Sequence, residues 1–187
     1  GSVTGGGTYA DGVSVTLTAT AKEGYKFAGW YENSARVSNS LSYTFNATKD
    51  RTIEAKFNTI ITTANAQITA PVLGGHPDMN PVSSDPEKYT VTLMSWWRSG
   101  SSLKLDEDDV FEIGNEYVIR VQFTPKSGYT LDDAVYTVNG QETSRYGTIT
   151  TVREAEFVFL DSSVTYNLTV NGGNICIHCE LYVTALV

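Results

Sequence analysis

The chain has 187 residues, of which 41% are hydrophobic and 18% charged, and its formal net charge is -8 at pH 7. This composition is typical of a soluble globular protein and excludes a largely disordered chain. Excess negative charge would repel a phosphate backbone, so we expect no nucleic acid as a partner. Since no apolar run approaches the roughly 18 residues of a membrane-spanning helix, we also expect no membrane insertion.

The first third of the chain predicts short β-strands. Residues 13 to 19 alternate, with Val13, Val15, Leu17 and Ala19 on one face and polar side chains on the other. Further strands are expected at residues 25–31, 41–45 and 52–57, with a loop at 33–40. The spacing of about ten residues between strands favours a small sandwich-like or β-grasp-like domain.

The segment GYKFAGWYE, Gly24 to Glu32, is unusually rich in aromatic rings. Strict alternation places Tyr25, Phe27, Gly29 and Tyr31 on one face of a strand and Trp30 on the other. Two explanations of Trp30 remain open. A bulge near Gly29 turns its ring inward, or the ring packs on the next domain.

A second β domain is expected after a junction at residues 59–63. Its predicted strands are 66–70, 89–97, 117–124, 135–138, 148–152 and 155–159. Between the first two lies a proline-rich loop, Pro71 to Pro86, and Asn139-Gly140 is a strong hairpin signal. The predicted architecture is all-β, with domains at 1–58 and 59–160, the second an Ig-like sandwich. Residues 161–187 are predicted to form a hairpin, either a truncated third repeat or a completing strand pair.

Residues 3 to 57 resemble the divergent internalin-B B-repeat family, which occurs in tandem on bacterial surface proteins. The resemblance is carried by Gly12 before the VTLTA strand, the block Gly24-Tyr25-x-Phe27-x-Gly29-Trp30, Tyr43-Thr44-Phe45, and Asp50-x-Thr52-Ile53-x-Ala55-x-Phe57. It makes Tyr25, Phe27, Gly29 and Trp30 the structural signature of the repeat. Such repeats usually begin with one more strand, for which only Ser2-Val3-Thr4 is present.

The second domain is similar to another repeat of Gram-positive surface proteins, through Trp96, the run Phe111-x-x-Gly114-x-x-Tyr117 and Gly128-Tyr129. Both Gly24-Tyr25 and Gly128-Tyr129 follow a strand and a short turn, which indicates related geometry. These resemblances imply a non-catalytic, extracellular or cell-surface repeat region that acts as a spacer and protein-interaction module.

The alternative function is an adhesin that binds host protein or glycan through Trp96, Trp97, Arg98 and the Pro71 to Pro86 loop. Neighbours on a strand face opposite ways, so if one indole lies in the core the other is exposed or covered by a second layer. An exposed tryptophan beside Arg98 would suit stacking on a sugar ring.

Metal, redox and catalytic functions find less support. The carboxylates of Asp106, Asp108 and Asp109 offer oxygen ligands for Ca²⁺, but the run lacks EF-hand spacing and is also typical of a solvated acidic loop. Cys176 and Cys179 have C-x-x-C spacing, yet in a strand residues three apart face opposite ways. No catalytic triad is visible. We therefore expect no enzyme and no cofactor.

Overall fold

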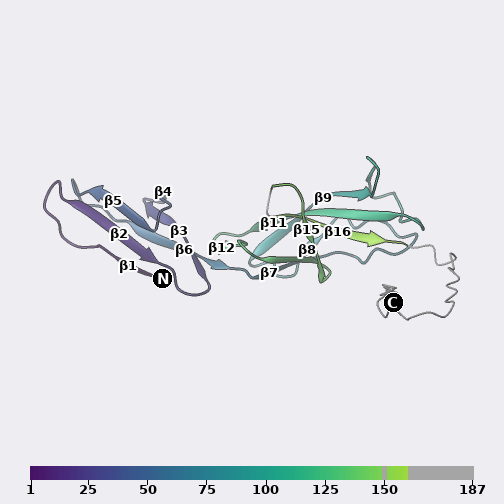
Figure 1. Cartoon of the computed structure of the whole chain (residues 1–187), viewed down its shortest axis with the longest axis horizontal. Helices are drawn as coiled ribbons and strands as arrows, with labels where there is room; N and C mark the ends of the chain where they lie inside the picture. The colour runs from purple at the N-terminus through teal and green to yellow at the C-terminus, as the bar shows by residue number, and fades with distance from the viewer. Residues whose placement is uncertain (149–150, 160–187) are drawn as a thin grey trace, which may run out of the picture.

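The computed structural model describes residues 1–148 and 151–159, and every regular element in them is a β-strand. This confirms the predicted all-β class. Figure 1 shows two β units end to end. We call residues 1–60 the first unit and residues 63–159 the second unit. Each has a separate hydrophobic core.

The first unit contains six strands. They are β1 (Ser2–Thr4), β2 (Ser14–Thr20), β3 (Tyr25–Glu32), β4 (Ala35–Ser38), β5 (Ser42–Asn46) and β6 (Glu54–Ile60). One sheet has the order β1-β2-β5, and the other contains β6, β3 and β4 in that order. Val15, Leu17 and Ala19 of β2 are buried as the alternation predicts, whereas Val13 precedes the strand and is 43% exposed.

One prediction about strand content is corrected here, and one open point is resolved. The predicted loop at 33–40 contains β4, which pairs with β3 through a tight turn in which Asn33 and Ser34 have φ of 48° and 67°. Serine rarely adopts positive φ, so the sequence gives little signal for this hairpin. Ser2-Val3-Thr4 forms the expected initial strand, because β1 pairs antiparallel with the end of β2.

A β-bulge directs Trp30 into the core of the first unit. The register between β3 and β6 shifts between Phe27 and Gly29, so Ala28 is an extra residue in β3. Phe27 and Trp30 therefore share a face, and their ring centroids lie 5.6 Å apart. Of the two explanations, the bulge holds. Among the other signature residues, Phe27 is half-buried, but the Tyr25 ring is 43% exposed and lies outside the core.

We expect Gly29→Ala to destabilise the first unit by about 1–3 kcal/mol. Gly29 has φ of 141°, and a Cβ there would lie 2.8 Å from Arg36 Cδ and 2.9 Å from the carbonyl oxygen of Ser38. Urea unfolding would measure the loss. The control is Gly6→Ala, where a Cβ meets nothing within 4 Å and the change should stay within about 0.5 kcal/mol. Equal effects at the two glycines would contradict the strain assigned to Gly29.

The second unit is a sandwich of two sheets. Its strands are β7 (Thr63–Gln67), β8 (Val82–Ser83), β9 (Tyr89–Arg98), β10 (Lys104–Leu105), β11 (Glu116–Pro125), β12 (Tyr129–Thr130), β13 (Val135–Val138), β14 (Gln141–Glu142), β15 (Ser144–Arg145) and β16 (Val152–Val158). The sheet orders are β10-β9-β11-β16-β15 and β14-β13-β7-β8. The core draws on both sheets, with Ile119 and Val121 from the first and Ala64, Ala66 and Val138 from the second, all essentially inaccessible.

Several predicted strands of the second unit shift or merge in the structure. β7 begins at Thr63, earlier than the predicted 66–70, and pairs parallel with β13. Strands were predicted at 148–152 and 155–159, but β16 runs without a break through residues 153 and 154, and residues 149–150 lie outside the described residues. The predicted hairpin at Asn139-Gly140 is present, since β13 pairs with β14 and both turn residues have positive φ. The predicted C-terminal hairpin lies outside the described residues.

Candidate functional site

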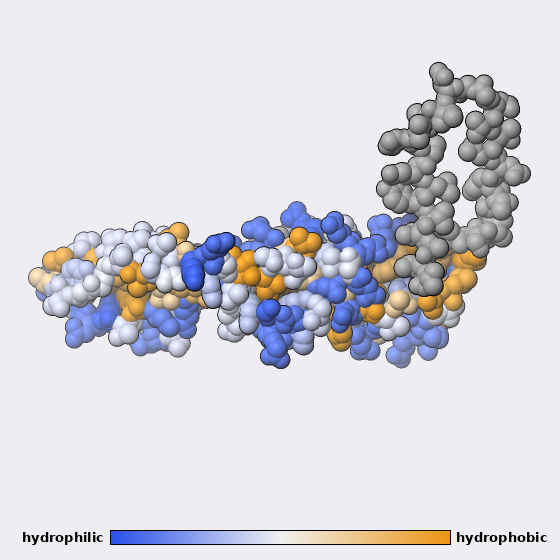
Figure 2. Space-filling model, turned by 90° about the horizontal axis from the view of Figure 1, so that it is seen from below, coloured by the Kyte–Doolittle hydropathy of each residue, from blue (hydrophilic) through white to orange (hydrophobic). Residues whose placement is uncertain are grey.

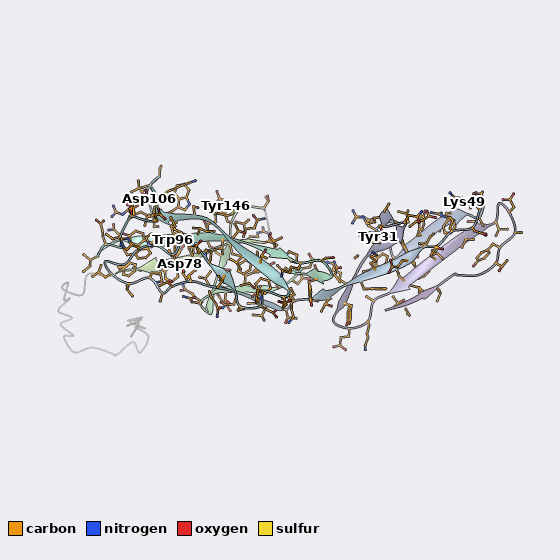
Figure 3. The ribbon with its side chains drawn as sticks, turned by 180° about the vertical axis from the view of Figure 1, so that it is seen from behind. Tyr31, Lys49, Asp78, Trp96, Asp106 and Tyr146 are labelled. Atoms are coloured by element: carbon orange, nitrogen blue, oxygen red, sulfur yellow. The ribbon has the colours of Figure 1, made fainter. Side chains whose placement is uncertain are left out.

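Trp96 is a core residue, so the prediction that it forms part of a binding surface is wrong. Its side chain is 0% exposed, and its ring packs on Phe111 with centroids 5.4 Å apart. The indole Nε1 donates a hydrogen bond to the carbonyl oxygen of Asp78 at 2.9 Å. Figure 3 shows Trp96 and Asp78 close together in the second unit. The segment Pro71 to Pro86 was predicted as a loop, but it contains the short strand β8, which pairs with β7. Through Asp78 this segment helps to anchor the tryptophan.

A second bulge decides which of the two tryptophans is buried. β9 and β11 pair Arg120 with Ser95 but Val121 with Leu93, so Met94 is an extra residue. Tyr89, Val91 and Leu93 face the core side before the bulge, and Trp96 faces it afterwards. Without the bulge, strict alternation would have sent Trp97 inward instead.

Trp97 is half-buried on the outer face of the sheet, beside a shallow cleft of about 320 Å³. Its ring centroid lies 5.1 Å from Lys104 Nζ and 5.6 Å from Arg120 Cζ, on the two strands that flank β9. The Arg120 guanidinium also lies 3.3 Å from the Tyr146 ring centroid and pairs with Glu154. Trp97 is therefore an aromatic site held between cations, and a stacking ligand must compete with them.

Arg98 and the acidic run are engaged in local contacts. Arg98 forms a salt bridge with Glu112. Asp106 Oδ1 accepts a hydrogen bond from the Asp108 amide, and Asp109 Oδ2 accepts one from the Asp106 amide. These carboxylates stabilise their own turn, and in residues 1–148 and 151–159 no three His, Cys, Asp or Glu side chains form a group suited to a metal ion. Cys176, His178 and Cys179 lie outside the described residues.

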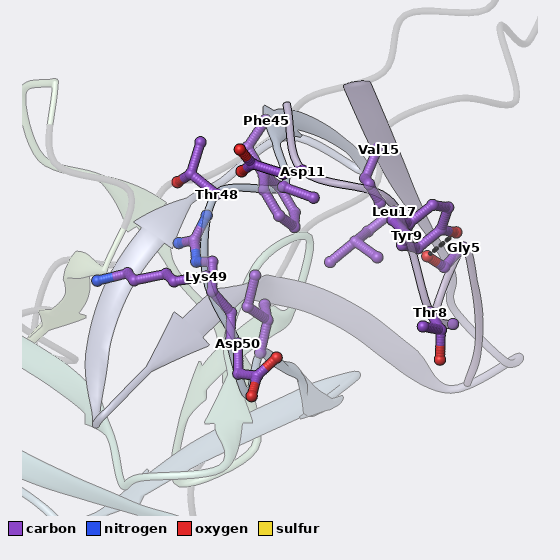
Figure 4. Close-up of a pocket in the computed structure, with 15 residues that line it drawn as sticks. Gly5, Thr8, Tyr9, Asp11, Val15, Leu17, Phe45, Thr48, Lys49 and Asp50 are labelled. Carbon is purple, nitrogen blue, oxygen red and sulfur yellow. Dashed lines mark hydrogen bonds between the residues drawn. The ribbon is translucent and has the colours of Figure 1, made fainter. Parts of the chain in front are cut away.

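The first unit has an open cleft of about 600 Å³ at its outer end (Figure 4). The chain from Gly5 to Asp11 and the loop from Ala47 to Arg51 frame it, and Val15, Leu17 and Phe45 supply apolar surface. The Tyr9 hydroxyl donates a hydrogen bond to the Gly5 carbonyl oxygen at 2.8 Å, which fixes the glycine-rich loop. The sequence did not single out these residues, because they gather only when β2 and β5 lie side by side.

One of the charged groups lining this cleft, the guanidinium of Arg51, is already paired. Arg51 donates two hydrogen bonds to Glu32, at 3.0 and 2.7 Å, and its Cζ lies 4.4 Å from the Phe45 ring centroid. The hydrogen bonds from Arg51 hold the pKa of Glu32 below its ordinary value and raise the pKa of Arg51. A bidentate pair of this kind orients the guanidinium and leaves little charge for a ligand.

The two units are joined by a continuous main-chain ladder. β12 of the second unit pairs in parallel with the end of β6, with Tyr129 opposite Thr59. The Thr59 amide donates to the Gly128 carbonyl oxygen at 2.8 Å, and the Ile61 amide donates to that of Thr130 at 2.9 Å. β12 thereby becomes the edge strand of the sheet β12-β6-β3-β4.

The two Gly-Tyr pairs of the sequence, Gly24-Tyr25 and Gly128-Tyr129, meet at this junction. Tyr25 of β3 pairs with Thr59 from the opposite side of β6, and the Ile60 amide donates to the Gly24 carbonyl oxygen at 2.9 Å. Thus Gly24-Tyr25 and Gly128-Tyr129 flank the same residue. Their resemblance was visible in the sequence, but their meeting was not, because about a hundred residues separate them.

An ion pair and two buried side chains support the ladder. Lys26 Nζ lies 2.9 Å from Asp132 Oδ2, a bridge between the units whose side chains are about half exposed. Ile61, in the connection between the units, and Leu131 are 6% and 4% exposed, and both pack in the core of the second unit. Only two residues separate β6 from β7, so the connection has little freedom to bend.

The pKa of Asp132 lies below its ordinary value, chiefly through a hydrogen bond from the Thr130 hydroxyl and then through Lys26. A carboxyl with a lowered pKa in the folded state adds stability above its unfolded pKa of about 3.9, and this stability is lost as the pH falls through the folded value. We expect Thr130→Val to raise the Asp132 pKa more than Lys26→Gln does. A carboxyl-carbon NMR titration would measure both, and the reverse ranking would contradict the assignment.

Taken together, the fold and its junction define an all-β region in which two units are linked through their sheets. Residues 1–61 match the family model of the divergent InlB B-repeat domain, which confirms the family predicted from residues 3–57. Repeats of this family are typical of bacterial surface proteins. The match ends at residue 61, so the resemblance of the second unit to another repeat stays a prediction.

Comparison with curated proteins and with solved structures gave no match. In the part of the chain that the structure describes, no helix is long and apolar enough to cross a membrane.

Proposed function

We propose that this chain is a rigid spacer in the repeat region of a bacterial surface protein. The observation that carries the proposal is the main-chain ladder between β6 and β12, with hydrogen bonds of 2.8 and 2.9 Å across the junction. Each such bond adds roughly 1 kcal/mol, and together with the Lys26–Asp132 bridge they oppose bending between the units. A spacer needs this property, because a freely jointed chain does not hold a fixed distance.

The extracellular location and the protein-interaction role belong to the same proposal. The family match over residues 1–61 supports a surface location. The negative net charge of -8 supports solubility of an extended repeat region.

The test is a distance measurement across the junction. Cys176→Ser and Cys179→Ser remove both cysteines of the chain, and exposed Asp11 and Ser102 are replaced by spin-labelled cysteine. Pulsed electron paramagnetic resonance should give one narrow distance distribution. A broad distribution in this parent protein would contradict a rigid spacer.

A matched pair of variants at Thr59 tests whether the ladder causes the rigidity. Thr59→Pro removes the amide that donates to Gly128 but leaves the Ile60–Gly24 bond in place. We expect the distance distribution to broaden in Thr59→Pro and to remain narrow in Thr59→Val, which keeps the amide. If both variants stay narrow, the rigidity has another source.

A second candidate function is binding of a host glycan or protein at the Trp97 surface. The half-exposed ring, the neighbouring Tyr146 at 44% exposure and the shallow cleft between them favour it. Aromatic rings with nearby polar groups suit sugar stacking and protein contacts.

Glycan arrays and host matrix proteins provide the test of this second function. We expect parent binding to be lost in Trp97→Ala and kept in Tyr25→Ala, an exposed aromatic residue far along the chain from the cleft. An absence of binding by the parent protein would eliminate the candidate and leave the spacer alone.

A further inference from the structure

Apolar side chains gather at the end of the second unit that lies away from the first unit. Val72, Leu73, Val110 and Ile113 are 59%, 57%, 41% and 47% exposed, and we call these four residues the distal patch. Hydrogen bonds from the Gly74 amide to the Phe111 carbonyl oxygen and back from the Phe111 amide to Gly75 bring the two segments together. Figure 2 shows hydrophobic surface, in orange, at this end of the molecule.

At the opposite end of the second unit, apolar residues are buried because the first unit lies next to them. There Ile61 and Leu131 are 6% and 4% exposed, next to the strand pairing with the first unit. The distal patch exposes four large apolar side chains without such a neighbour among the described residues. A gathered apolar surface of this kind marks an interaction site more often than scattered exposed residues do.

The described chain ends beside this patch. Phe159 exchanges main-chain hydrogen bonds with Gly114 and Asn115, at 2.7 and 3.0 Å, and its ring stacks on Phe111 with centroids 5.3 Å apart. Residues 160–187 therefore start next to Ile113, within immediate reach of the patch.

The sequence of residues 160–187 suits an apolar surface. Val164, Tyr166, Leu168 and Val170 alternate with polar residues. The segment has only two carboxylate side chains, Asp161 and Glu180, and no lysine or arginine. A two-stranded hairpin alone is at best marginally stable in water, so it needs a surface to pack on. We infer that residues 160–187 dock on the distal patch through the apolar face of residues 164–170.

This docking is intramolecular and is independent of the spacer proposal. It makes the second unit a layer between two neighbours, with the first unit at one end and residues 160–187 at the other. The distal patch is then an internal interface of the chain and is not open to a host ligand.

Paramagnetic relaxation in the whole chain tests the inference, because both cysteines of the sequence lie in the docking segment. A nitroxide on Cys176 in a Cys179→Ser protein should broaden the methyl signals of the distal patch, so that they lose most of their intensity. These are the signals of Val72, Leu73, Val110 and Ile113. The methyl signals of Val3, Val13 and Leu41 in the first unit should keep theirs. Signal loss that is absent at the patch, or equal throughout the protein, would overturn the inference.

Two charge variants provide matched controls. Leu73→Asp should restore the Val110 and Ile113 signals, whereas Val82→Asp, at a residue 55% exposed on β8, should not. Both positions are exposed, so neither change threatens folding. Restoration by neither variant, or by both equally, would contradict docking at the patch.

A mixing experiment separates docking within one chain from contact between chains. Isotope-labelled protein without nitroxide is combined with nitroxide-labelled protein of natural isotopic composition. Undiminished patch signals support the intramolecular contact. Signal loss in the mixture would mean that a second copy occupies the patch, which overturns the inference.

Discussion

Trp30→Ala is expected to unfold the first unit while the second unit stays folded. Trp30 is 1% exposed in a core whose other fully buried residues are Val15, Leu17 and Ala19. Replacing a buried tryptophan by alanine costs about 3–5 kcal/mol, a large share of the roughly 5–15 kcal/mol that stabilises an ordinary domain. The substitution also leaves the Ser40 carbonyl oxygen without its hydrogen bond from the indole.

Amide NMR spectra and urea unfolding would measure this result unit by unit. Signals of residues 1–60 should collapse to unfolded positions, and those of β9, β11 and β16 should remain dispersed. Trp30→Phe is the control, because it keeps a ring beside Phe27 and loses mainly the bond to Ser40. A first unit that remains folded with unchanged stability in Trp30→Ala would refute the central role of this side chain.

The neighbouring residues Trp96 and Trp97 are expected to respond very differently to alanine. Trp96→Ala should destabilise the second unit by about 3–5 kcal/mol, because the ring packs on Phe111 and Phe157 and bonds to Asp78. Trp97→Ala should cost about 1 kcal/mol, since its half-exposed ring loses mainly the contacts with Lys104 and Arg120.

Urea unfolding of the two variants, followed by the signals of the second unit, provides the comparison. Each substitution is the control for the other, as both remove an indole from the same strand. Equal losses, or a larger loss for Trp97→Ala, would mean that the bulge at Met94 does not set the face of β9 in solution. A well-folded Trp97→Ala protein is also the condition for its use in the binding test.

The motifs that contribute to the candidate site could be recognised in the sequence, but their arrangement in space could not. The Gly-Tyr marks, the tryptophan pair and the proline-rich loop were all visible as motifs. Their placement depended on contacts between distant segments, such as Asp78 with Trp96 and Gly128 with Thr59. Neither the cleft framed by Gly5 to Asp11 nor the pairing of β12 with β6 could be predicted from neighbouring residues. Each depends on a contact with a segment elsewhere in the chain.

The sequence by itself determined the all-β class, the strands with clean alternation such as β2 and β11, and the family of residues 1–61. These features follow from local periodicity and from motifs that lie within a few residues of each other. The tertiary structure alone decided the faces of Trp30 and Trp96. A bulge reverses the alternation of every residue after it, and its position is set by the hydrogen-bonded register with another strand, β6 in one case and β11 in the other.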